Sequence, residues 1–152
     1  VVLAKFFGAM IFYVVLWVPT LVYFAIFQYI THQTAAGSFG AYWGSYLMLL
    51  LLGMFYISIG CFASVLTRNQ IIAAVISFCA ITLHFFSGLI TFIVTEVSST
   101  MRQVLGYFSA LEQMATLSRG EIDTRPIVLY LSLTIVMLGL TYQAFQSRKW
   151  KL

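Results

Sequence analysis

Long apolar runs separated by short polar breaks divide the chain. Between Lys5 and Arg68 there is no formally charged residue, and a stretch rich in Gly, Ser, Thr and Gln, residues 28–40, supplies the break. The tetrapeptide at 67–70 is a second break, a tight polar turn. In hydrocarbon only α-helices and closed barrels satisfy all of their backbone hydrogen bonds, and these runs are too long for barrel strands of about 10 residues. The pattern therefore predicts an all-α polytopic membrane protein with four spans, at residues 6–27, 42–66, 71–94 and 127–145.

The segment between the third and fourth spans, residues 95–125, is too polar to cross a membrane. It contains every acidic residue of the chain: Glu96, Glu112, Glu121 and Asp123. Its apolar residues recur at a spacing near 3.6, which predicts one or two short amphipathic helices that lie along the membrane interface or dip into it. The apolar stripe consists of Val97, Met101, Val104, Leu105 and Phe108, with Leu111 or Glu112 in the next turn. The block at 118–121 is expected to end this helical region.

Composition excludes a soluble globular domain. The 152 residues are 62% hydrophobic and 8% charged, whereas soluble domains carry about 25% charged residues. The net charge of +4 does not indicate nucleic-acid binding, because the basic residues are not clustered with aromatic residues on a polar surface. Orientation in a membrane explains the charge better.

The basic residues predict which side of the membrane faces the cytoplasm. Four spans place both termini and the 67–70 turn on one side, and that side carries basic residues without any acid. These residues are Lys5, Arg68, Arg148, Lys149 and Lys151. The other side carries three arginines against four acids, so the positive-inside rule places both termini in the cytoplasm. Trp150 adds an interfacial anchor beside the C-terminal basic residues.

Few residues suggest chemistry. The sequence has no phosphate-binding loop of the form GxxxxGK[ST], no Ser/His/Asp grouping and no HExxH or GxSxG motif, so we expect no catalytic activity, no cofactor and no metal on this chain. Cys61 and Cys79 lie inside apolar runs without metal-ligand spacing, and we interpret them as small core residues.

His84 is the one ionisable side chain near the middle of a span, and Thr82 and Ser87 flank it. An intramembrane ionisable group is a candidate for a transport path, so these three residues form the candidate site. The alternative, which we favour, is a neutral histidine that hydrogen-bonds a neighbouring helix. A haem with two histidine ligands is not expected, because His32 lies at the opposite, loop end.

Small residues also recur at four-residue spacing within the spans, which predicts faces for close helix packing. The pairs are Ala4 and Gly8, Gly60 and Ser64, and Ala73 and Ser77.

Three stretches carry a resemblance to a known family. The first is the start of a span at Lys5–Ala9. The second runs from Gly44–Leu47 through Ile59–Ser64 into Leu66–Gln70. The third is a loop with glycine and Ile-Asp at Ser118–Asp123, followed by Tyr130–Thr134 and the basic tail Ser147–Trp150. Together they resemble, over almost the whole chain, the membrane permeases of ABC type-2 exporters, most closely the gliding-motility and nitrous-oxide-accessory-like branch.

The resemblance implies a role and partners. Such permeases have six spans, both termini in the cytoplasm, and short re-entrant extracytoplasmic helices before the last span. The four spans here match the third to the sixth, so we expect a fragment or processed product, consistent with a start at Val1 rather than Met. The resemblance implies a permease in the cytoplasmic (inner) membrane, working as a homo- or heterodimer with two separate ATPase subunits.

Two other classes of protein remain open from the sequence. One is a membrane scaffold or assembly protein that moves no substrate. The other is a small secondary transporter, which predicts an acid in mid-membrane or an inverted repeat. The apolar spans contain no Asp or Glu.

Overall fold

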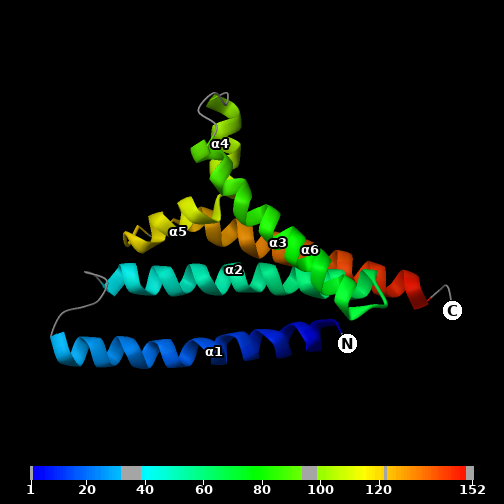
Figure 1. Ribbon diagram of the computed structural model, residues 1–152, viewed down its shortest axis with the longest axis horizontal. Coiled ribbons are helices and arrows are strands. Elements are labelled where there is room, and N and C mark those ends of the chain that lie inside the picture. Colours follow the sequence, from blue (N-terminus) through cyan, green and yellow to red (C-terminus); the bar gives the residue numbers. More distant parts are fainter. Residues whose placement is uncertain (1, 32–38, 94–98, 122, 150–152) are drawn as a thin grey trace.

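The computed structural model describes residues 2–31, 39–93, 99–121 and 123–149, which form six α-helices (Figure 1). The helices are α1 (Val2–Thr31), α2 (Phe39–Leu66), α3 (Gln70–Ile93), α4 (Ser99–Phe108), α5 (Ala110–Ser118) and α6 (Thr124–Lys149). No strand occurs among the described residues. Helices α1, α2, α3 and α6 are each long and apolar enough to cross a membrane. The prediction of an all-α chain with four helices of spanning length is confirmed.

Helices α1 and α6 extend beyond the predicted spans at both ends, and α2 and α3 begin before theirs. Helix α1 continues to Thr31, so the first residues of the predicted 28–40 break are helical. Helix α6 starts at Thr124, which places Pro126 in its first turn as expected. Hydrophobicity marks the part of a helix that suits hydrocarbon, and a helix can continue past it into the polar headgroup region. Residue 94, the predicted end of the third span, lies outside the described residues.

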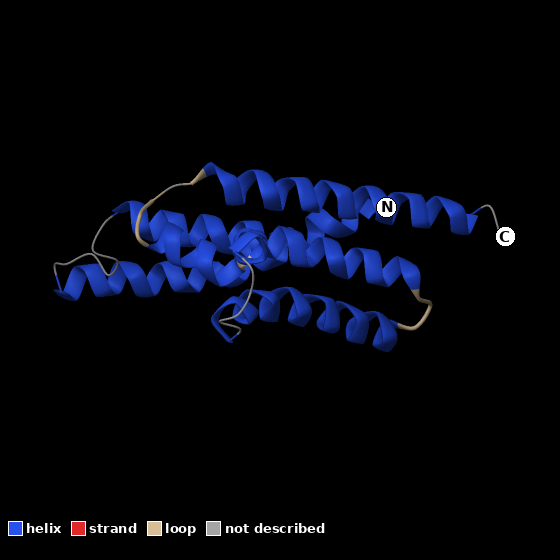
Figure 2. Cartoon of the chain, turned by 90° about the horizontal axis from the view of Figure 1, so that it is seen from above, coloured by secondary structure: helices blue, strands red, loops and turns tan. Residues whose placement is uncertain are grey.

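Helix α2 is the central element. It packs most extensively against α6 and also contacts α1, α3 and α5. Helix α1 lies along one side of α2, while α3 crosses α2 obliquely and leads to α4 away from the bundle (Figure 1). Figure 2 shows the same long helices from above, with both chain termini toward one end of the bundle. The turn between α2 and α3 lies at that end too (Figure 1).

The core lies where α2 faces α5 and α6. Buried side chains recur along α2 every three or four positions, at Met48, Leu51, Phe55 and Ile59, as expected for one face of a helix. Leu117 of α5 and Tyr130 of α6, both with no exposed surface, complete the cluster.

Helix α6 also buries polar side chains. Thr134 and Thr141 are buried, and each hydroxyl donates to the carbonyl four residues earlier, at 2.7 Å in both cases. These bonds satisfy the hydroxyl hydrogens within the helix, so the threonines pack as small side chains and leave no donor unpaired.

Side chains in the connections fix where the helices begin. Asn69 Oδ1 accepts the backbone N–H of Ile71 at 2.9 Å at the start of α3. Ser109 caps α5 by accepting the N–H of Glu112 at 3.3 Å. Asp123 accepts the N–H of Arg125 at 3.1 Å in the first turn of α6. Each of these three connections thus contains an Asn, Ser or Asp that replaces a hydrogen bond missing from the first turn.

A glycine ends α5. Gly120 has φ 85°, in the left-handed region that favours glycine, and its N–H donates to the carbonyl of Leu117 at 3.0 Å. The prediction that the block at 118–121 ends this helical region is confirmed.

The polar segment contains two helices, and only α4 fits the predicted interfacial stripe. Helix α4 exposes Met101, Val104 and Phe108, whereas α5 packs onto α2 and α3 and buries Ala110 and Leu117. The break at Ser109 resets the helical register, so one periodic stripe could not describe both helices. Val97 and Glu96 of the prediction lie outside the described residues.

Candidate functional site

His84 joins two helices near the centre of the structure. It lies on α3, and its Nδ1 is 3.1 Å from the hydroxyl of Tyr56 on α2. The imidazole also meets the rings of Phe55 and Tyr130 edge-on, with centroids 5.2 Å and 6.1 Å away. The structure thus contains the interhelical hydrogen bond that we favoured for this histidine.

Two polar atoms of this cluster have no protein partner among the described residues. They are Nε2 of His84 and the hydroxyl of Tyr130, both buried. Burying an unpaired donor or acceptor costs about 1–3 kcal/mol of stability. A further hydrogen-bonding group at this cluster would therefore be favourable. The cluster's polar groups are an imidazole and two phenols, which can donate and accept hydrogen bonds.

The structure does not bring Thr82 and Ser87 to the imidazole as a polar trio. The hydroxyl of Ser87 donates to the backbone carbonyl of His84 at 2.6 Å and is therefore engaged within α3. Thr82 is half-buried and two residues before His84, and residues two apart on a helix do not face each other. The rings that contact the imidazole belong instead to Phe55, Tyr56 and Tyr130.

Sequence reasoning missed both tyrosines. Tyr56 is 28 residues from His84, so no spacing rule within one helix connects them. A hydroxyl in the middle of an apolar span was the available signal, because a buried tyrosine hydroxyl usually has a hydrogen-bond partner.

Two glycines allow α5 and its N-cap residue to approach α2 and α3 closely. A Cβ added to Gly44 of α2 would lie 2.6 Å from the carbonyl oxygen of Leu117, and one added to Gly88 of α3 would lie 3.3 Å from Cα of Ser109. Backbones approach this closely only where no side chain intervenes. Gly88 is one turn after His84, so α5 begins beside the histidine cluster.

The predicted packing glycines behave differently. Gly8 and Gly60 have open space where a Cβ would lie. Of the predicted small residues Ala73 is buried, while Ala4 and Ser64 are exposed. The prediction of close packing was therefore wrong for Gly8 and Gly60 within this chain.

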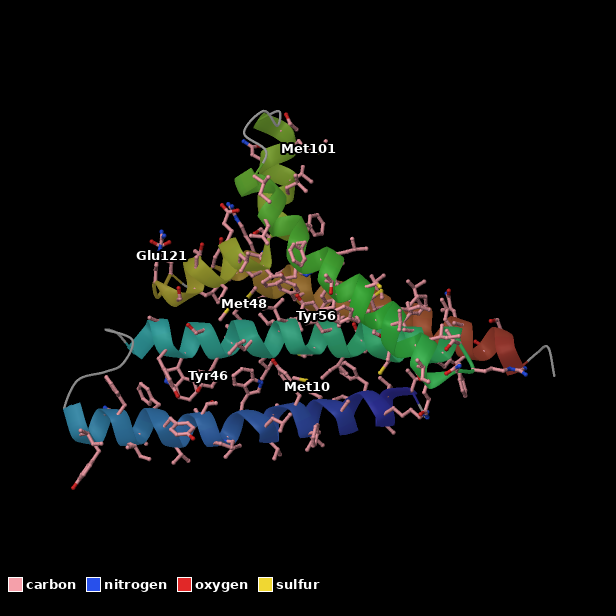
Figure 3. The ribbon with its side chains drawn as sticks, viewed as in Figure 1. Met10, Tyr46, Met48, Tyr56, Met101 and Glu121 are labelled. Carbon is pink, nitrogen blue, oxygen red and sulfur yellow. The ribbon has the colours of Figure 1, made fainter. Side chains whose placement is uncertain are left out.

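Basic and acidic residues lie toward opposite ends of the bundle. The N-terminal part of α1, the turn with Arg68 and the end of α6 lie at one end, and the acidic Glu121 lies toward the other (Figure 3). Helix α6 extends through residues 148 and 149, and Trp150 lies outside the described residues. At the acidic end Asp123 and Arg125 form an exposed ion pair of 3.8 Å. An exposed pair of this kind contributes little stability, about 0–1 kcal/mol.

Within the described residues no group of three or more His, Cys, Asp or Glu side chains could hold a metal ion. No protein-family model, no curated protein and no solved structure matches the chain.

Proposed function

We propose that the chain is the permease part of an ATP-driven exporter of the ABC type-2 kind, working as a dimer with two separate ATPase subunits. The observation that supports this most is the placement of α4 and α5. They lie between the third and fourth long helices, and α5 folds back onto α2 and α3 at the acidic end of the bundle. This is the order of parts in the permeases that the sequence resembles.

The distribution of charge agrees with the same proposal. The acid-free basic residues gather where both termini lie, so the positive-inside rule puts that end in the cytoplasm, where ATPase subunits would act. The opposite end then carries α5 and the acidic residues outside the cell.

The large apolar surface supports a partner within the membrane. The accessible surface is 10448 Å², about a third more than the roughly 7,800 Å² expected for a soluble monomer of 17.1 kDa. Helix α1 contributes much of this surface, since no residue in the 18-residue apolar stretch of its span is buried. Lipid and a second permease copy together would cover this surface.

In this proposal ATP binding by the partner subunits changes the tilt of the permease helices. Only a ligand that binds two states with different affinity shifts their balance, so ATP must favour one arrangement of the helices over the other. The contact between α2 and α3 at Tyr56 and His84 is a polar bond that such a tilt would stretch.

A reconstitution experiment tests the proposal. The chain is purified alone and together with the ATPase encoded beside it, and both preparations are placed in nanodiscs of phosphatidylcholine. We expect the two proteins to copurify and hydrolyse ATP, and we expect the chain alone to hydrolyse none. A variant of the ATPase lacking its phosphate-binding lysine is the matched control.

Two results would overturn the proposal. One is ATP hydrolysis by this chain after removal of every partner. The other is copurification with a complex that has no ATPase subunit, which would favour the scaffold.

A further inference from the structure

An apolar groove of about 440 Å³ lies between α1 and α2. Five residues of α1 and six of α2 line it: Tyr13, Val14, Trp17, Val18, Leu21, Trp43, Gly44, Tyr46, Leu47, Leu49 and Leu50. Tyr46 of α2 extends toward α1 there (Figure 3). The volume falls within the range of small-molecule sites, about 300–1,000 Å³. The groove lies at the opposite side of α2 from α3, so it is separate from the His84 cluster.

The polar atoms at the groove are already engaged within the protein. The Tyr13 hydroxyl donates to the carbonyl of Leu49 at 2.9 Å. The Thr20 hydroxyl donates to the carbonyl of Trp17 at 2.6 Å, so the Tyr46 hydroxyl, 2.7 Å from it, donates to Thr20. No lining residue carries a charge, so the groove is complementary to an uncharged occupant that needs no hydrogen bond.

The groove is too narrow to enclose a helix. Residues 13–21 rise about 12 Å along α1, so a volume of 440 Å³ corresponds to a mean cross-section of about 37 Å². An α-helix with its side chains is about 10–12 Å wide and has a cross-section of about 80–110 Å², two to three times larger. An unbranched hydrocarbon chain is much narrower.

The groove begins near the membrane boundary and stays within one leaflet. The candidate span Gly40–Leu66 has 27 residues, about 40 Å, which exceeds the hydrocarbon thickness of about 30 Å by about 5 Å at each end. Trp43 is about 4.5 Å from the start of that span, at the boundary where tryptophan is enriched. The groove runs from there about 10 Å inward to Leu50.

We propose that this groove is a binding site for an acyl chain of a membrane phospholipid, in the leaflet at the acidic end of the bundle. The lipid lies with its headgroup beside Trp43 and its chain between α1 and α2. This site depends on insertion of the chain in a membrane and does not depend on export or on an ATPase.

Filling the groove tests the proposal. Val18→Phe and Leu47→Phe place a larger ring in the lining from opposite walls, and Val15→Phe adds the same ring to an exposed position of α1 outside the lining. The protein is purified in mild detergent from nanodiscs of phosphatidylcholine, and native mass spectrometry counts retained lipid. We expect one phospholipid on the wild type and on Val15→Phe, and loss of it from both filled variants.

Tryptophan fluorescence locates the lipid. The chain has three tryptophans, so Trp150→Phe leaves the two groove tryptophans, Trp17 and Trp43, as the reporters. Phosphatidylcholine brominated in its acyl chain should quench their fluorescence, and the filled variants should lose most of this quenching while Val15→Phe keeps it. Circular dichroism checks that each variant is helical, and two filled variants guard against one that fails to fold.

Three outcomes would overturn the proposal: no retained phospholipid on the wild type, equal retention by filled and control variants, or a dimer mass that the filled variants alone abolish. The last outcome would assign the groove to a second copy of the chain.

Discussion

Gly44 is the position where one added methyl group should separate two helices. A Cβ there would lie 2.6 Å from the carbonyl oxygen of Leu117 and 3.4 Å from its carbonyl carbon. The obstacle is backbone, so a rotamer change cannot relieve the contact and α5 must move. We therefore expect Gly44→Ala to displace α5 from α2 and to expose Leu117.

The magnitude follows from comparison with Gly60 on the same helix. Alanine favours a helix interior over glycine by about 1 kcal/mol at either position. Overpacking costs about 1–3 kcal/mol, and only Gly44 incurs it, because nothing lies within 4 Å of a Cβ on Gly60. Gly44→Ala should thus be less stable than Gly60→Ala by about 1–3 kcal/mol.

Two measurements check this difference. Unfolding by titration with dodecyl sulfate in mixed micelles, followed by circular dichroism, gives the free energy of unfolding of each variant. Hydrogen exchange by mass spectrometry then reports on residues 110–118, where we expect faster exchange in Gly44→Ala only. Equal stability of the two variants together with unchanged exchange in α5 would refute the packing argument.

Three further predictions concern single side chains. His84→Gln should keep most of the interhelical hydrogen bond to Tyr56, whereas His84→Leu should lose it. A double-mutant cycle with Tyr56→Phe should give a coupling energy of about 0.6 kcal/mol, and a coupling energy of zero would contradict the bond. Cysteine placed at Glu112 should react with an impermeant maleimide in intact cells, and cysteine placed at Arg68 should react only after permeabilisation; the reverse pattern would invert the topology. Asn69→Ala should destabilise α3 by about 0.5–2 kcal/mol in the same unfolding assay because the first-turn N–H loses its acceptor, with Asn69→Ser nearly neutral.

The apolar runs predict the four long helices because the hydrophobicity of a helix depends only on the residues within that helix. Turn chemistry also predicts Gly120 as the end of α5, since a left-handed residue after a helix favours glycine. Both are local properties of the sequence.

Contacts between helices could not be predicted in the same way. Four-residue spacing pointed to Gly60, yet the close approach occurs at Gly44, because the folding of α5 onto α2 determines which face of α2 is covered. Likewise, His84 could be singled out as a polar residue in a span, but its partner Tyr56 depends on how α3 crosses α2. Spacing within one helix contains no information about such crossings.

Because a short turn joins α2 and α3, a change in the angle between these helices displaces the residues farthest from the turn most. Three residues join them, and the hydroxyl of Thr67 donates to the carbonyl of Asn69 at 2.7 Å, which holds the turn closed. His84 is about 21 Å along α3 from that turn, so a change of about 10° in the angle between the helices would move it by about 4 Å. A hydrogen bond does not survive such a displacement. The bond between Tyr56 and His84 therefore constrains the angle between α2 and α3, and the close approach of Gly88 to Ser109 constrains α3 one turn further along.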